Sequence, residues 1–116
     1  MAIPSGSGTE ALKRFYINNH SSTEATLLDG VADHIYTILS VSFCEMSAQN
    51  EILSMGIHYD GGGTAIHLLH DQPIGGKQTY VYNERIVLVG TDELRAVFSS
   101  SATVDIWGSY IDQDWT

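Results

Sequence analysis

The sequence has few of the residues that can stabilise a fold by anything other than an apolar core. It holds a single cysteine, Cys44, which excludes a disulfide within the chain. Its apolar runs are short, and none approaches the roughly 18–20 residues that a membrane-spanning helix needs. Basic residues are scarce, 5 against 14 acidic ones, which gives a net charge of −9. The fold must therefore rest on its apolar core or on contacts with other chains.

The charge balance excludes two classes of partner. Affinity for nucleic acid comes largely from Lys and Arg side chains that neutralise phosphates. Anionic membranes attract basic segments in the same way. We therefore expect no nucleic-acid partner and no membrane partner. The acidic surface favours solubility and leaves open a docking site on a basic protein surface.

The length of 116 residues fits one domain with one core. Residues 1–11 are small and polar and predict an extended N-terminal arm, and the start Met1 to Gly6 lacks the pattern of a signal peptide. A capping box formed by Ser7 and Glu10 is a minor alternative for this segment. Because Phe15-Tyr16-Ile17 favours a strand, we predict a β domain over residues 12–111 and a C-terminal tail over 112–116.

Side chains of the domain alternate with a period of two. In segment 34–44 the alternate residues from Ile35 to Phe43 are apolar, which predicts that this face points into a core. That face consists of Ile35, Thr37, Leu39, Val41 and Phe43. Similar faces follow at Leu53, Met55, Ile57, Tyr59; Ile66, Leu68; Tyr80-Val81-Tyr82; 86–89; Leu94, Ala96, Phe98; and Val104, Ile106, Gly108, Tyr110.

Turn signals separate these runs at Asp29-Gly30, residues 60–63, 73–76, Asn83-Glu84 and 90–92. About eight short strands at this spacing predict an all-β fold, an antiparallel β-sandwich or jelly roll. No strong helical segment lies between the runs, which disfavours a parallel α/β sheet.

The glycine-rich segments do not predict a phosphate-binding loop. Such a loop requires a lysine and a following helix N-terminus. Strand-like residues follow both the run at 60–64 and Gly75-Gly76-Lys77. We interpret both segments as turns, in which glycine allows a positive φ.

No pattern of residues predicts a catalytic or metal site. His67 and His70 are three apart, which would place them on opposite faces of a strand. His58 and His67 flank the glycine-rich turn, but no Cys or acidic partner has zinc-ligand spacing. Cys44 has no His/Asp arrangement beside it, and the acids at 92–93 and 112–114 do not predict two carboxyls facing across a cleft. We therefore expect a non-enzymatic protein without a cofactor or metal.

The C-terminal segment contains the clearest candidates for protein contacts. Trp115 lies near the end of the sequence, and Trp and Tyr are favoured anchors at interfaces. An interface role for Trp115 and packing on its own domain both remain open. The predicted interface residues are Ile3 and Pro4 in the arm, Tyr110 and Trp115 near the C-terminal end, and Trp107 on the last strand.

The pattern from Thr26 to Ile111 resembles small phage virion proteins with a β-sandwich fold, found as capsid cement or decoration proteins and as tail- or fibre-associated domains. The segments that carry the resemblance are Thr26-Leu27-Leu28, Ile35 to Phe43, Ile52 to Tyr59, the Pro-Ile-Gly-Gly-Lys-Gln turn at 73–78, residues 86–95 and Val104-Asp105-Ile106-Trp107. The sequence departs from that family at Val31-Ala32, where many relatives carry a proline, and in its Gly62-Gly63 turn. The motifs are more specific for the fold than for the role.

The resemblance implies a structural protein of the phage particle, often trimeric, with no catalytic residue. The leading hypothesis is a homotrimeric cement protein on the capsid surface, made in the host cytoplasm and bound to the major capsid protein. A tail, baseplate or fibre component is the first alternative. The second alternative is a carbohydrate-binding module with Tyr36, Tyr80, Tyr82 and Trp107 as a stacking platform.

Overall fold

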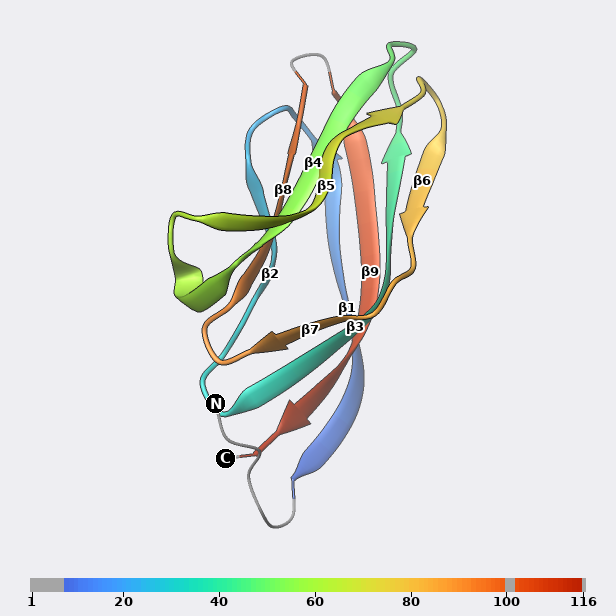
Figure 1. Ribbon diagram of the computed structural model, residues 1–116. Coiled ribbons are helices and arrows are strands. Elements are labelled where there is room, and N and C mark those ends of the chain that lie inside the picture. The colour runs from blue at the N-terminus through green and yellow to red at the C-terminus, as the bar shows by residue number, and fades with distance from the viewer. Residues whose placement is uncertain (1–7, 100–101, 116) are drawn as a thin grey trace.

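The computed structural model describes residues 8–99 and 102–115, and they form two antiparallel β-sheets packed face to face (Figure 1). Sheet A is formed by β1 (Thr9–His20), β9 (Val104–Asp114), β3 (His34–Glu45), β6 (Thr79–Tyr82) and β7 (Ile86–Val89). Sheet B is formed by β2 (Ala25–Asp29), β8 (Glu93–Phe98), β4 (Glu51–His58) and β5 (Ala65–Ile74). A single 3₁₀ turn, η1 (Tyr59–Gly61), joins β4 to β5. None of the described residues belongs to a helix long and apolar enough to cross a membrane.

The order of the strands is that of a jelly roll. Strands β6 and β7 both pair with β3. Strand β6 pairs with Val41–Cys44 and β7 pairs with Ile35–Ile38, so the two act as one interrupted strand. Sheet A then reads β1-β9-β3-β6/β7 and sheet B reads β2-β8-β4-β5, an eight-strand double sheet. The predicted all-β sandwich is confirmed. The strand count is nine because the chain leaves β3 briefly at residues 83–85.

The core fills the space between the two sheets. Its most deeply buried apolar side chains are Ile38, Val41, Phe43, Leu53, Met55, Leu88, Leu94, Val104 and Ile106. Gly108 on β9 belongs to this face because its partner on β1 is Phe15. A Cβ atom at Gly108 would overlap the Phe15 ring, so the glycine provides the space that the ring fills.

The predicted core face of β3 is correct for only half of the strand. Val41 and Phe43 are buried, but Tyr36 and Ile38 face the core in place of Ile35, Thr37 and Leu39. The pairing of β3 with β9 skips one residue between Ile38 and Ser40, which is a β-bulge at Leu39. One extra residue reverses the alternation of side chains, because the period of a strand is two.

Two other predicted core positions are also wrong. Tyr59 is exposed because the strand ends at His58 and Tyr59 begins the η1 turn. Ile66 is exposed on the edge strand β5.

The ends of the domain differ from the predicted boundaries. Strand β1 begins at Thr9, within the segment expected to be an arm, and no helix forms around Glu10. Strand β9 continues to Asp114, within the expected tail. Both extensions have one cause, because Thr9–Leu12 and Ile111–Asp114 pair with each other.

Candidate functional site

Of the five predicted interface residues, Ile3 and Pro4 lie outside the described residues, and the other three lie apart from one another. Trp107 lies on the outer face of sheet A and is 49% exposed. Trp115 follows the end of β9 and is half-buried, whereas Tyr110 is buried in the core. The structure therefore does not bring the predicted residues together into one surface.

Tyr110 is not an exposed anchor, which corrects the expectation for this residue. Its ring packs against Phe15 and Tyr36, with centroids 6.1 and 5.0 Å away. Tyr110 is separated from Gly108 by one residue, so both side chains point to the core face of β9. Burial raises the pKa of the Tyr110 hydroxyl above its ordinary value. Its role is to fill the core.

Trp115 packs against its own domain. Its backbone N–H donates to the carbonyl of Asp33, at 3.0 Å. A Cβ atom added to Gly8 would touch the indole ring, so the ring lies directly on this glycine. The indole Nε1 is buried, and no residue in 8–99 or 102–115 accepts its hydrogen bond. Among the described residues, Trp115 therefore packs on its own domain, which was one of the two alternatives. Its buried indole N–H has no acceptor among them.

Trp107 belongs to an aromatic cluster on the outer face of sheet A. It lies directly opposite Tyr16 on β1, which is 61% exposed. The two rings stack with centroids 5.8 Å apart and planes 21° from parallel. The guanidinium carbon of Arg14 lies 5.3 Å from the Trp107 ring centre and 5.6 Å from that of Tyr16. At exposed sites such cation–π contacts contribute about 0.5–1 kcal/mol, which favours this arrangement of the three side chains.

A groove runs along this cluster across β1, β9 and β3. Its volume is about 480 Å³. The residues that line it are Tyr16, Ile17, Asn18, Ser42, Cys44, Asp105, Ile106 and Trp107. Sites for small ligands typically measure about 300–1,000 Å³, so this groove has the size of a binding site.

The polar side of the groove is positioned by a bulge in β1. The pairing of β1 with β9 is irregular between Ile17 and His20, and Asn19 has a positive φ of 52°. Asparagine tolerates this left-handed conformation better than most residues. The bulge directs the Asn18 amide and the Asn19 N–H to the same oxygen of Asp105, at 3.1 and 2.8 Å. This network fixes the Asp105 carboxylate at the edge of the groove.

The stacking platform expected for a carbohydrate-binding module is wrong in its composition. Tyr36 is buried, and Tyr80 and Tyr82 pack against the core. Only Trp107 of the expected four faces outward. The bulge at Leu39 explains the place of Tyr36, because it turns the first half of β3 over. The outward aromatic partner of Trp107 is Tyr16, from the opposite end of the sequence.

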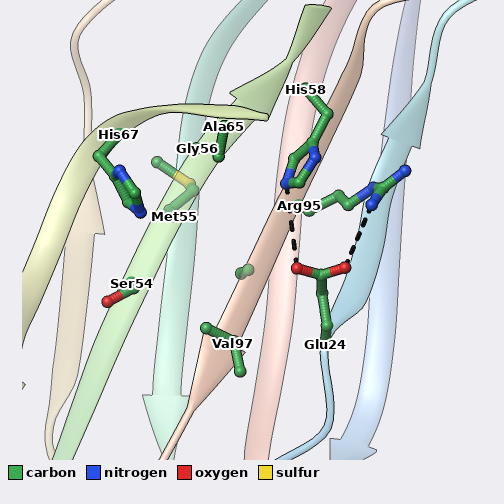
Figure 2. A pocket seen from close by; sticks show the side chains of 10 residues that line it. Glu24, Ser54, Met55, Gly56, His58, Ala65, His67, Arg95 and Val97 are labelled. Carbon is green, nitrogen blue, oxygen red and sulfur yellow. Dashed lines mark hydrogen bonds and ion pairs between the residues drawn. The ribbon is translucent and has the colours of Figure 1, made fainter. Parts of the chain in front are cut away.

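A second, much smaller hollow lies on the outer face of sheet B (Figure 2). Its volume is about 40 Å³, enough for water and far below that of a substrate site. Glu24 lies between His58 and Arg95, with an oxygen 3.9 Å from His58 Nε2 and another 3.2 Å from an Arg95 nitrogen (Figure 2). Arg95 also pairs with Glu93 at 3.0 Å. These paired side chains connect the start of β2 with the end of β4 and with β8.

His67 and His70 lie on the same side of β5, which corrects the prediction of opposite faces. Their rings meet edge to face with centroids 4.9 Å apart. The pairing of β4 with β5 shifts between Met55 and Gly56, so β5 contains an extra residue between the two histidines. The bulge therefore cancels their odd spacing. No group of three metal-ligating side chains occurs among the described residues.

Comparisons with known proteins agree on the fold. Neither a protein-family model nor a curated protein matches the sequence. A chain of the infectious bursal disease virus T13 particle is similar in structure, with a TM-score of 0.61 and 12% identity over 98% of this chain and 33% of that one. A chain of the Bacillus endospore appendages, which are disulfide-linked pili, has a TM-score of 0.60 and 13% identity over 100% and 97%.

A phage capsid is also among the similar structures. A chain of the Helicobacter pylori bacteriophage KHP30 capsid has a TM-score of 0.51 and 8% identity, over 90% of this chain and 86% of that one. At these identities the likeness is one of fold. The resemblance to virion β-sandwich proteins is therefore confirmed at that level: this chain has a jelly-roll fold that viral capsid proteins and a bacterial pilus protein also have.

Proposed function

We propose that this protein is a non-enzymatic structural protein of a phage particle, a capsid cement protein that binds as a homotrimer to the major capsid protein and stabilises the head. Its fold supports this role, because the similar structures come from viral particles and from pili, which are assemblies of many subunits. The role requires surfaces that bind other chains, and the described residues offer two such features.

The edge strand β1 is the observation that carries the proposal. It is 12 residues long and pairs with β9 on one side, and none of the described strands pairs with its other side. Residues 9–14 are exposed, and Leu12 is 74% exposed. A long edge with an apolar side chain is a template for pairing with another chain. We propose that β1 binds a neighbouring copy or the capsid surface.

The second feature lies at the same end of the sandwich as Leu12. Gly8 contacts the Trp115 ring there, and residues 1–7, including Ile3 and Pro4, precede Gly8 in the sequence. The buried indole N–H of Trp115 has no acceptor among the described residues. Because this nitrogen is buried, a neighbouring chain supplies its acceptor only if Trp115 moves off Gly8 on binding. Several such contacts around a threefold axis would combine by avidity.

The test measures assembly in solution and on capsids. Leu12→Asp and a deletion of residues 1–7 should each reduce trimer formation and the occupancy of cement-free capsids at least tenfold. Val87→Asp is the matched control, because Val87 is equally apolar and 53% exposed but lies on β7 at the opposite edge of sheet A. Sedimentation measures the oligomer, and electron cryomicroscopy measures the occupancy. A wild-type chain that is monomeric and leaves capsids bare contradicts the proposal.

A tail, baseplate or fibre component is the alternative within the same class. Its fold and edge strand would be the same. The copy number in purified particles separates the two roles, since a cement protein follows the number of capsid subunits and a tail protein follows the symmetry of the tail.

A further inference from the structure

The groove on the outer face of sheet A has two chemically different walls. Tyr16 and Trp107 form one wall and are half-exposed or more. Asn18 lies two residues after Tyr16 on the same face of β1, and Arg14 lies two residues before Tyr16 on that face. Arg14 therefore supports the aromatic wall from the side away from Asn18.

The opposite wall presents polar atoms that retain hydrogen-bonding capacity. Asp105 Oδ1 accepts from Asn18 and from Asn19. Its second oxygen, Oδ2, has no partner among the described residues. The Asn18 amide has two N–H groups and uses one on Asp105. The Ser42 hydroxyl lies on β3, directly opposite Trp107, and makes only a long bond, 3.4 Å, to the Trp107 carbonyl.

These walls restrict the class of ligand. A nucleotide would stack on the rings, but phosphates would approach Asp105 on a protein of charge −9. A wholly apolar ligand would cover the polar wall and leave its donors and acceptors without partners, which is unfavourable. A sugar ring satisfies both walls, because its C–H face packs on an aromatic ring while its hydroxyls donate to a carboxylate and accept from an amide.

We propose that this groove binds a neutral carbohydrate, with one sugar ring on the Tyr16–Trp107 wall and its hydroxyls on Asn18 and Asp105. The groove volume of about 480 Å³ accommodates a mono- or disaccharide. The proposal goes beyond the virion role and does not depend on it, because its test measures sugar binding at Trp107 and the trimer test measures the oligomer. Tyr16 and Leu12 lie four residues apart on the same strand, β1.

The first experiment uses the only two tryptophans of the chain. The Trp115→Phe variant leaves Trp107 as the single indole, so its fluorescence reports the groove alone. Lactose, maltose, N,N′-diacetylchitobiose and rhamnose are titrated separately. We expect at least one of them to change the emission in a saturable manner, with a Kd on the order of 1 mM or tighter.

The second experiment assigns the binding to the two walls by saturation-transfer NMR on the full chain. Tyr16→Ala and Trp107→Ala should each weaken binding at least tenfold, and Asn18→Ala should weaken it several-fold. Val81→Ala should leave it unchanged, because Val81 is exposed on the same sheet face but does not line the groove. A urea unfolding curve of each variant confirms that it is folded.

Three results would overturn the assignment. The first is no saturable signal from any of the sugars up to about 10 mM. The second is binding that persists in folded Trp107→Ala. The third is a proline-rich decapeptide that perturbs Trp107 when none of the sugars does, which would assign the groove to a peptide. None of these results bears on the trimer measurement, so the two proposals fail separately.

Discussion

At the scale of the residue, Asp112 joins three strands of sheet A. Its carboxylate is 3% exposed and accepts from Lys13 Nζ of β1 at 2.7 Å and from His34 Nδ1 of β3 at 2.8 Å. Burial alone would raise the pKa of Asp112, but the hydrogen bonds and charges of Lys13 and His34 together outweigh burial and lower it. The ionised form of Asp112 therefore stabilises the native state.

This lowered pKa predicts a loss of stability in acid. An aspartate has a pKa of about 3.9 in the unfolded chain. The contribution of Asp112 is complete above that value and is lost as the pH falls through its lower folded value. Asp112→Asn should lower the free energy of unfolding by roughly 1.5–3 kcal/mol at pH 7 and by much less at pH 2.

Urea unfolding at pH 7, 4 and 2 measures this difference. Asp29→Asn is the control, since Asp29 is exposed on β2, and its effect should stay within about 0.5 kcal/mol at each pH. An Asp112→Asn effect that is equally large at pH 2 would show that packing, and not charge, is lost.

At the scale of the element, the bulge in β3 determines which side chains form the core. Ile38 is fully buried, and its neighbour Leu39, the bulged residue, is half-buried. Ile38→Ala should lower the free energy of unfolding by about 2–5 kcal/mol, and Leu39→Ala by less than half as much. Chemical denaturation of the two variants compares adjacent residues of the same size. A larger effect at Leu39 would contradict the register of β3.

The same bulges limit what the sequence predicts. The period of two locates most of the strands and the glycine-rich turns, because both depend on near neighbours in the chain. The start of β1 is missed, since it lies in the segment expected to be an arm. A predicted face is wrong on one side of a bulge, as at Tyr36 and at His70, because one unpaired residue leaves no clear mark in the pattern. The aromatic wall was missed for a different reason: Tyr16 and Trp107 meet only through the β1–β9 register, about 90 residues apart in sequence.

At the scale of the molecule, the net charge of −9 opposes contacts between copies. Two of the five basic side chains, Lys13 and Arg95, already pair with acids of the same chain. Repulsion between copies acts over the Debye length, about 10 Å at 0.1 M salt and about 3 Å at 1 M. Salt therefore favours association between acidic copies and weakens attraction to a basic partner.

Salt is therefore expected to have opposite effects on the two proposed contacts. Raising NaCl from 0.05 to 0.5 M should strengthen trimer formation several-fold, as measured by sedimentation. Docking on capsids through a basic surface should weaken over the same range. If both contacts respond in the same direction, at least one of them is governed by groups other than the net charge.

The pairing of β1 with β9 also governs how the molecule is made. These strands lie next to each other in sheet A although one is the first of the nine and the other the last. Contacts between such distant residues slow folding, because a large loop must close before they form. During synthesis β1 must wait, with Phe15 uncovered, until β9 has left the ribosome. The β4–β5 pair of sheet B, whose strands follow each other in the sequence, forms its contacts sooner.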